Sequence, residues 1–398
     1  MNEQKLAEEK LNKYHQEHIL ELMSKLKDTQ KQEIIDQILK IDFDKISELY
    51  ENTKKVKEID QNQITPINYI DKEKIDIKEK EELQKLGEQL IKNDQYAVVT
   101  MAGGQGTRLG FSGPKGTYKL DIGEKGKYIF EILADNLKKS KKLYNMLPYW
   151  YIMTSSENNK QTIEFFEEHN YFEYNREKVK FFKQANIPML TKEGKLVLEN
   201  NKIKTASDGN GGVFLALNKE KMIDDMKSNN IKLAYLCGVD NIMVNAIDPI
   251  FIGLTLKQNM QIASKSVHKA YPEEKVGVFC KRNGKPSIVE YIELSEKMRN
   301  ERNKNGELVY GEANTLSHLL SVEAIEKVAN QNLKYHLAIK NNLYKFEKFY
   351  FDAFPYLDDM LVMRVKREEE FAPIKNKEGV DSPKTAKEIY EKYYKVEK

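Results

Sequence analysis

Residues 98 to 118 read VVTMAGGQGTRLGFSGPKGTY, and no other stretch says more about the fold of this chain. The apolar, β-branched start predicts a buried strand, which leads into a loop with six glycines. Glycine can adopt a positive φ and has no Cβ, so the N–H groups of Gly103, Gly104 and Gly106 can approach phosphate oxygens closely. Arg108 and Lys115 add positive charge to the same loop. The stretch therefore predicts a strand followed by a loop that wraps a polyphosphate.

The glycine spacing argues against two common nucleotide-binding loops. The sequence has no Gly-x-x-x-x-Gly-Lys-Ser/Thr run, and the spacing from Gly104 does not fit Gly-x-Gly-x-x-Gly. ATPase and dehydrogenase functions are therefore disfavoured.

Composition limits the class of partner and the compartment. The 65 basic and 62 acidic residues nearly balance at +3, so no global field favours nucleic acid or an anionic membrane. Cys237 and Cys280 lie in apolar, strand-like runs, which is typical of buried free thiols in a reducing compartment. The sequence shows neither a signal peptide nor an apolar run of about 18 residues. We therefore expect a cytoplasmic protein that does not bind membranes.

Changes of pattern along the chain indicate three parts. Residues 1–93 are almost free of glycine and show helical spacing, so they predict a helical N-terminal unit. Residues 94–375 form the expected catalytic domain, and residues 376–398 form a C-terminal helical tail.

Alternation of strands and helices in the expected catalytic domain predicts an α/β fold. Strands are expected at residues 96–101, 149–153, 179–182 and 233–237, with helices at 129–142, 158–169 and 214–226 between them. This order indicates a doubly wound, mainly parallel, Rossmann-like sheet, whose ligands lie beyond the carboxyl ends of the strands. Runs at 275–281 and 286–293 flank Asn283-Gly284 and predict antiparallel extensions.

Two carboxylates and a second glycine-rich segment are further candidates for the site. Asp240 follows the fourth strand and suits Mg²⁺, although a loop cap fits that position as well. Asp352 could complete the metal site, or it could cap a helix. The segment Asp208-Gly209-Asn210-Gly211-Gly212 precedes an apolar helical run, so it can cap the helix and present amides to a ligand.

These segments resemble, in their order, those of UDP-sugar pyrophosphorylases, specifically the eukaryotic-type UDP-N-acetylglucosamine pyrophosphorylases. Besides the glycine loop, the matching segments are 208–212, 239–241, 248–253, 289–291, 349–352 and 370–376. Two positions depart from the family pattern: Ala185 stands where the family usually has glycine, and Ser207 where it has proline.

The resemblance implies a nucleotidyltransferase fold of type A, with the antiparallel extensions on the sugar side. It implies catalytic cations at Arg108, Lys115 and Lys375, the last of them at the sugar phosphate. Its nucleotide-binding residues would be Gly103, Gly104, Gly106, Thr107, Gln184 and Gly209, with Gln184 pairing with uracil. Its sugar-binding residues would be Asn210, Gly277, Glu290, Asn314, Phe349 and Phe351. Asp240 and Asp352 would bind Mg²⁺, with Mn²⁺ as the alternative.

The resemblance also implies a reaction, in which UTP and N-acetylglucosamine 1-phosphate give UDP-N-acetylglucosamine and pyrophosphate. The sugar phosphate would attack the α-phosphorus of UTP in line, without a protein nucleophile. Alternatives are glucose 1-phosphate or a broader set of acceptors, a glycosyltransferase that consumes UDP-sugar, and a non-catalytic UDP-sugar-binding protein. Family members usually continue into a small C-terminal domain beyond residue 386, whereas this chain ends at Lys398, so we expect a monomer.

Overall fold

The computed structural model describes residues 3–55 and 63–395, which divide into two compact units. Within the described residues, unit 1 holds residues 3–55, 185–212 and 333–349, and unit 2 holds the rest. This division does not follow the 93/94 boundary expected from composition. The reason is α5 (Ile77–Lys92), a polar helix in sequence whose buried Leu83, Leu90 and Ile91 belong to the core of unit 2.

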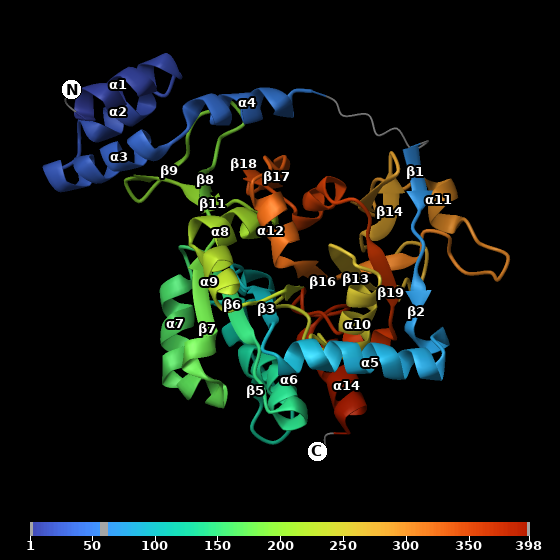
Figure 1. Ribbon diagram of the computed structural model, residues 1–398. Helices are drawn as coiled ribbons and strands as arrows, with labels where there is room; N and C mark the ends of the chain where they lie inside the picture. The colour runs from blue at the N-terminus through green and yellow to red at the C-terminus, as the bar shows by residue number, and fades with distance from the viewer. Residues whose placement is uncertain (1–2, 56–62, 396–398) are drawn as a thin grey trace. The chain divides into compact units, whose positions relative to one another are not determined.

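A large mixed sheet forms the centre of unit 2 (Figure 1). Its strands follow the order β2 (Ile70–Asp71), β19 (Leu361–Arg364), β13 (Ile262–His268), β16 (Glu312–Ser321), β12 (Leu233–Gly238), β3 (Tyr96–Met101), β6 (Tyr149–Thr154) and β7 (Val179–Lys183). The pairs β12–β3, β3–β6 and β6–β7 are parallel, as are β13–β19 and β19–β2. Only β16 runs against its neighbours on this path, between β12 and β13. The expected mainly parallel α/β fold is therefore confirmed.

The predicted elements of the first half of the sheet agree closely with the structure. The four expected strands are β3, β6, β7 and β12, and two of the expected helices are α6 (Ile129–Tyr144) and α7 (Asn159–Glu168). The helix expected at 214–226 is wrong as a single element. It divides into α8 (Val213–Lys219) and α9 (Met222–Ser228), because Lys221 adopts a left-handed conformation at φ 63°.

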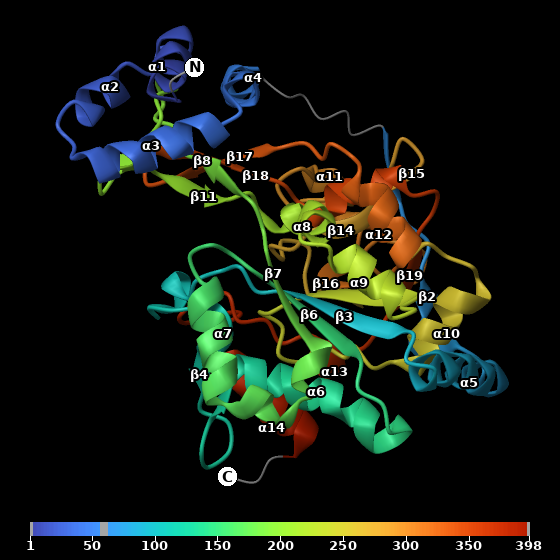
Figure 2. The same cartoon turned by 60° about the vertical axis from the view of Figure 1, so that its left-hand side comes forward.

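Helices cover both faces of this sheet (Figure 2). On one face, α5, α6 and α10 (Pro249–Lys257) share a buried cluster with Tyr96 and Val98 of β3. On the other face lie α8, α9 and α12 (Val322–Ala329), where the Tyr151 hydroxyl of β6 donates a hydrogen bond to Asp225 of α9 over 2.7 Å. Unit 2 also contains the short helices α11 (Glu296–Asn300) and α13 (Arg367–Glu370), the helix α14 (Pro383–Tyr394), and a small antiparallel pair of β4 (Lys119–Leu120) and β5 (Lys127–Tyr128).

The predicted antiparallel extension is present beside β16. Strands β14 (Val278–Arg282) and β15 (Lys285–Val289) form a hairpin, and β14 also pairs with β1 (Ile64–Pro66) and, at Ala313, with β16. Asn283 and Gly284 have φ values of 53° and 74°, which a two-residue hairpin turn of this kind requires. The sequence signal at Asn283-Gly284 is thereby confirmed.

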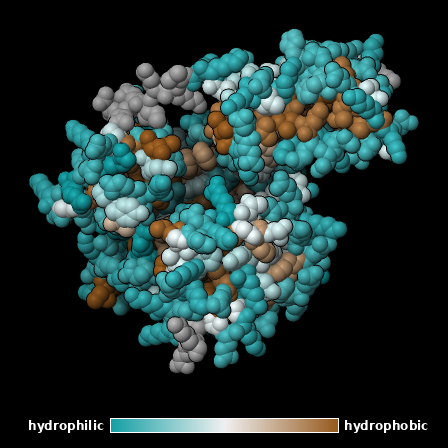
Figure 3. Space-filling view, turned by 180° about the vertical axis from the view of Figure 1, so that it is seen from behind, coloured by the Kyte–Doolittle hydropathy of each residue, from teal (hydrophilic) through white to brown (hydrophobic). Residues whose placement is uncertain are grey.

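Unit 1 combines four helices of the described N-terminal residues with short hairpins from later in the chain. The helices are α1 (Glu3–Lys13), α2 (His18–Met23), α3 (Asp28–Lys40) and α4 (Phe43–Thr53). The strands are β8 (Asn186–Pro188), β9 (Leu198–Glu199), β10 (Lys202–Ile203), β11 (Thr205–Ser207), β17 (His336–Lys340) and β18 (Leu343–Glu347). Their core joins Ile34, Ile38 and Leu190, while hydrophobic side chains remain visible on the surface of this unit (Figure 3).

Two further expectations concern cysteines and membrane spans. Cys237 and Cys280 are buried free thiols, as the sequence predicts. Among the described residues, no helix combines the length and the apolar character that crossing a membrane requires.

The contact between α5 and α10 gives a test of the fold. A Cβ on Gly253 would lie 1.9 Å from the Leu83 carbonyl oxygen, and a Cβ on Gly87 would lie 2.0 Å from the Pro249 carbonyl oxygen. We predict that Gly253→Ala lowers the free energy of unfolding by about 2–3 kcal/mol in urea titrations, because two helix backbones must separate. The exposed α5 variant Lys85→Ala should stay within about 0.5 kcal/mol of wild type. Equal stability of Gly253→Ala and wild type would contradict this packing.

Candidate functional site

The glycine loop folds back on itself directly after β3. The Gly106 N–H donates to the Gly113 carbonyl over 2.9 Å, and the Lys115 N–H donates to the Gly104 carbonyl over 3.1 Å. Positive φ occurs at Gly110 and Gly113, whereas Gly106 has φ −77°; the expected use of positive φ at Gly103, Gly104 and Gly106 is wrong. Two of these three glycines instead leave room for side chains, since a Cβ on Gly103 would lie 2.3 Å from Gln184 Nε2 and one on Gly106 2.6 Å from Phe111.

Part of this loop is exposed, including Gly104 and Arg108. A Cβ on Gly104 would meet nothing within 4 Å, so the backbone at this position faces open space. Thr107 is exposed as well, in the short turn Thr107–Leu109. The exposed part of the loop can therefore receive a ligand against its backbone.

The Asn158 side chain holds this loop through hydrogen bonds, although no local sequence pattern predicts that role. Its Nδ2 donates to the carbonyl oxygens of Ala102 over 2.9 Å and of Gly104 over 3.4 Å, and its Oδ1 accepts from the Ser155 N–H. The side chain is fully buried. Gln184, the predicted base-reading residue, is also buried and is fixed at the end of β7 by a 2.9 Å bond from its N–H to the Thr154 carbonyl.

Three cations and one carboxylate that the sequence assigns to the site come together in unit 2. Burial lowers the pKa of Lys115 below its usual range, Asp240 opposes that shift, and Lys375 and Arg108 add to it. All three groups therefore lie within electrostatic reach of the Lys115 ammonium. Segments that are far apart in the sequence thus build one charged centre.

A short antiparallel bridge brings Lys375 beside Asp240. Asn241 pairs with Pro373, and the Ile374 N–H donates to the Asp240 carbonyl over 2.8 Å. The Asn241 side chain completes the bridge, because its Nδ2 donates to the Glu370 carbonyl and its Oδ1 accepts from the Ala372 N–H. Sequence reasoning gave no role to Asn241, since nothing local signals that it bonds to residues about 130 positions away.

The Lys375 ammonium is held but not enclosed. It lies 3.5 Å from an Asp381 carboxylate oxygen and 5.7 Å from the centre of the Phe371 ring, and its side chain is 39% exposed. The Lys375 N–H donates to the Asp381 carbonyl over 2.6 Å. An incoming anion can therefore reach this ammonium from solvent.

The predicted sugar-binding residues of unit 2 also meet. A Cβ on Gly277 would lie 3.1 Å from Glu290 Oε1, so the missing side chain makes room for that carboxylate. The Asn314 N–H donates to the Gly277 carbonyl over 2.9 Å. Phe351 and Asp352 lie in the turn Tyr350–Tyr356, where the Phe351 ring contacts Tyr350 edge-on at 5.5 Å.

Tyr350 belongs to this group, and sequence reasoning missed it. The Tyr350 hydroxyl accepts a hydrogen bond from Asn314 Nδ2, while Asn314 Oδ1 accepts from the Leu316 N–H over 3.0 Å. The second bond supports Leu316, which adopts a left-handed conformation at φ 57°. Burial raises the pKa of the Tyr350 hydroxyl, and the charges of Glu290 and Asp240 raise it further. The bond from Asn314 therefore fixes the place of the hydroxyl in this group.

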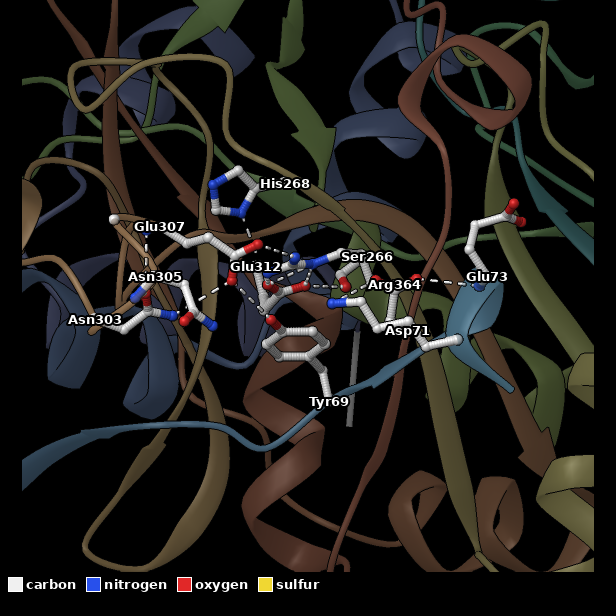
Figure 4. Close-up of polar contacts among 12 residues, drawn as sticks. Tyr69, Asp71, Glu73, Ser266, His268, Asn303, Asn305, Glu307, Glu312 and Arg364 are labelled. Atoms are coloured by element: carbon white, nitrogen blue, oxygen red, sulfur yellow. Dashed lines mark hydrogen bonds and ion pairs between the residues drawn. The ribbon is translucent and has the colours of Figure 1, made fainter. Parts of the chain in front are cut away.

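A polar cluster anchors the strand that carries Asn314 (Figure 4). Glu312 is buried and accepts hydrogen bonds from Arg364 Nε over 3.0 Å and from the Ser266 hydroxyl over 2.6 Å. The same Arg364 guanidinium donates to Glu307 over 3.1 Å and stacks on the Tyr69 ring at 3.9 Å. The cluster ties the loop before β16 to the end of β19.

The remaining predicted residues belong to unit 1. Gly209 has φ 88°, and a Cβ there would lie 2.4 Å from the Lys348 carbonyl oxygen. Asn210 begins the short turn Asn210–Gly212, and the Phe349 ring packs on His336 with 4.6 Å between ring centres. Their roles toward a substrate stay predictions, as do those of the predicted residues in unit 2.

Asp240 is the candidate ligand for Mg²⁺ at this site. Within residues 3–55 and 63–395, no group of three or more His, Cys, Asp or Glu side chains is arranged to hold a metal ion. Mg²⁺ usually binds proteins through one or two carboxylates and takes its other ligands from water and substrate phosphates. Asp240 fits that mode, because it is a single carboxylate near the cations that are predicted to bind phosphate.

Known proteins resemble this chain over most of its length. A sequence model of the UTP–glucose-1-phosphate uridylyltransferases matches residues 40–380. UDP-N-acetylglucosamine diphosphorylase 2 of Arabidopsis thaliana is 34% identical over 415 residues, covering 95% of this chain and 82% of the relative. UDP-N-acetylglucosamine pyrophosphorylase of Saccharomyces cerevisiae is 35% identical over 79% of this chain and 72% of its own length. The structure of that enzyme from Trypanosoma brucei, solved with an inhibitor, superposes with a TM-score of 0.83 at 27% identity, covering 98% and 84% of the two chains.

Asn158 offers a direct test of how the loop is held. In Asn158→Asp, the Oδ1 bond from Ser155 remains, but a buried carboxylate replaces the donor that faces two carbonyl oxygens. We predict a loss of about 3 kcal/mol in the free energy of unfolding at pH 7, measured with urea. The exposed α7 variant Lys160→Ala should change it by less than about 0.5 kcal/mol. Wild-type stability of Asn158→Asp would show that the side chain does not support the loop.

Proposed function

The chain belongs to the family of UTP–glucose-1-phosphate uridylyltransferases, and from that premise we propose that it makes UDP-N-acetylglucosamine and pyrophosphate from UTP and N-acetylglucosamine 1-phosphate. The observation that carries the proposal is the arrangement after the carboxyl ends of β3 and β12. The loop with Arg108 and Lys115 leaves the sheet there next to Asp240, whose carbonyl accepts the Ile374 N–H directly before Lys375. The relatives named for this activity match most of the chain, which supports the same acceptor sugar.

The chemistry follows from the charges of the site. The phosphate oxygen of the sugar attacks the α-phosphorus of UTP, and the bond from that phosphorus to the β-phosphate oxygen breaks. Arg108 and Lys115 stabilise the charge that grows on the departing pyrophosphate, while Lys375 holds the phosphate of the incoming sugar. Positioning and electrostatic stabilisation suffice for such a transfer, so no side chain needs to become a nucleophile.

Asp240 is the residue proposed to hold Mg²⁺, and Asp352 is the candidate for a second ligand. When bound there, the ion neutralises phosphate charge and makes the α-phosphorus easier to attack. Mn²⁺, which accepts the same oxygen ligands, is the alternative.

The group around Asn314 supports an N-acetylated acceptor. With Oδ1 accepting from Leu316 and one Nδ2 hydrogen donated to Tyr350, the amide can still offer its second Nδ2 hydrogen. A carbonyl oxygen, such as that of an acetamido group, accepts this hydrogen. Gly277 adds no side chain at this place, and the Glu290 carboxylate can accept sugar hydroxyls.

Compartment and oligomeric state complete the proposal. The buried free thiols of Cys237 and Cys280 suit a reducing compartment such as the cytoplasm. We expect a monomer, for which light scattering at micromolar concentration is the measurement.

The acceptor is tested by comparing kcat/KM for N-acetylglucosamine 1-phosphate, N-acetylgalactosamine 1-phosphate and glucose 1-phosphate at saturating UTP. We predict that the first is the best, by about tenfold over glucose 1-phosphate, since burial of one methyl group contributes about 1 kcal/mol. If glucose 1-phosphate reacts fastest, the predicted acceptor is wrong, while the proposed uridylyl transfer stands. If no sugar phosphate releases pyrophosphate from UTP, the proposed function is wrong.

Lys115 is tested through the pH dependence of kcat/KM. Burial lowers its pKa in the free protein, so the ammonium loses its proton at a pH below that of an ordinary lysine. We therefore predict an alkaline decline of kcat/KM in wild type. Lys115→Ala should lower turnover at pH 7 by roughly a hundredfold and abolish that decline. The exposed neighbour variant Lys119→Ala should keep both the rate and the decline. Near-wild-type turnover of Lys115→Ala would remove the residue from the mechanism.

A further inference from the structure

Three buried charged side chains and the partly buried Lys72 form a network in unit 2. The ammonium of Lys265, a residue of β13, lies 2.8 Å from Asp248 Oδ2, 2.7 Å from Glu370 Oε2 and 3.0 Å from the Asn245 carbonyl. Lys72 reaches the same Asp248 oxygen over 2.7 Å and lies 4.0 Å from Glu370. The side chains of Lys265, Asp248 and Glu370 are 1%, 3% and 8% exposed, so the charges meet almost without water. Two cations and two carboxylates make the network neutral in total.

Each member belongs to a different part of unit 2. Lys265 lies in a central strand, Asp248 caps α10 by accepting from the Phe251 N–H, and Lys72 precedes α5. Glu370 is the last residue of α13 and the first of the segment Glu370–Lys375, which runs to the cation predicted at the sugar phosphate. The network therefore fixes this segment to the sheet and to α10.

The backbone of the same segment is bonded to the residues that follow β12. The Glu370 carbonyl accepts from Asn241 Nδ2 over 2.8 Å, the Ala372 N–H donates to Asn241 Oδ1 over 2.9 Å, and the Ile374 N–H donates to the Asp240 carbonyl over 2.8 Å. The segment is thus held on one side by the Glu370 carboxylate and on the other by Asp240 and Asn241. Its register against Asp240 and Asn241 sets the position of the Lys375 backbone, from which the side chain extends.

Stability alone does not account for such a network. Desolvating buried ion pairs costs much of what their attraction gains, and apolar replacements of similar volume are often equally stable. The charges instead specify one arrangement. The Lys265 ammonium keeps all its partners only if Glu370, Asp248 and the Asn245 carbonyl stay in these positions. The burial of all three groups makes any other arrangement costly.

We propose that Lys265 and Glu370 are positioning residues, which hold the segment Glu370–Lys375 in register with Asp240 so that the Lys375 ammonium and the Asp240 carboxylate keep the spacing that uridylyl transfer needs. The proposal rests on the function proposed above. It concerns residues that do not touch substrate and act through Lys375 and Asp240.

The kinetic test uses Lys265→Met combined with Glu370→Met. This pair of changes removes one cation and one anion and leaves Lys72 paired with Asp248, so the variant should fold. We expect kcat to fall at least tenfold while the KM for UTP changes less than about twofold, because the predicted base contact at Gln184 is remote from the network. The single variant Glu370→Gln should show the same split between kcat and KM. Wild-type kcat in the double variant would overturn the proposal.

A control ion pair lies at the amino ends of the sheet strands, away from the carboxyl ends where the candidate site lies. Lys178 lies 2.6 Å from an Asp94 carboxylate oxygen. Lys178 directly precedes β7, and Asp94 stands two residues before β3, so both lie at the amino ends of these strands. Lys178→Met combined with Asp94→Asn removes an ion pair of similar length whose side chains are more exposed, at 16% and 32%, and kcat should remain within about twofold of wild type. An equal loss of kcat in this control would overturn the proposal, since any lost ion pair would then have the same effect.

A second measurement does not depend on activity. In Glu370→Gln, the amide hydrogens of Ala372 and Ile374 should exchange with deuterium at least tenfold faster than in wild type, while that of Leu236 within β12 should not change. Unchanged exchange at Ala372 and Ile374 would overturn the proposal. If wild type releases no pyrophosphate from UTP, the proposed function fails, and the exchange rates still decide whether the network holds the segment.

Discussion

The parallel pairing of β3 with β12 is the constraint on which the rest of the site depends. Val98 pairs with Tyr235, and Met101 pairs with Gly238 at the carboxyl ends of both strands. Parallel strands end at the same edge of a sheet, so the glycine loop and Asp240 must leave the sheet side by side. A slip of this register by one residue would turn every buried side chain of β12 to the other face, and the six residues of each strand are all buried.

The bridge from Asp240 and Asn241 to Pro373 and Ile374 adds the third cation to this edge. Lys375 comes from a segment about 130 residues later in the chain than β12, and its place depends on backbone bonds rather than on its own side chain. The same principle applies to Asn314, whose amide is oriented by Leu316 and Tyr350. Groups oriented before a ligand arrives need no reorganisation when charge moves, which is the main source of catalytic power in this kind of transfer.

The sequence predicts those features that local pattern determines. Strand β3, the loop after it and the Asn283-Gly284 turn each carry their own signal, because strand propensity, glycine and turn chemistry act over a few residues. What sequence reasoning missed depends on contacts between distant residues. Asn158 under the loop, Asn241 in the bridge, Tyr350 against Asn314 and Lys265 on Glu370, 105 residues away, are ordinary residue types without a motif. Sequence reasoning likewise did not locate the break at Lys221 or the positive φ at Gly110.

The central claim, that the phosphate oxygen of a sugar 1-phosphate attacks the α-phosphorus of UTP at this edge of the sheet, is tested most directly by isotope labelling. N-acetylglucosamine 1-phosphate that carries ¹⁸O in its phosphate is incubated with UTP and the protein, and the products are examined by ³¹P NMR. The account predicts an ¹⁸O-shifted signal for the phosphorus next to uridine, because the bridging oxygen comes from the sugar phosphate, together with unlabelled pyrophosphate. An unshifted uridine-side phosphorus, or label in the pyrophosphate, would contradict it.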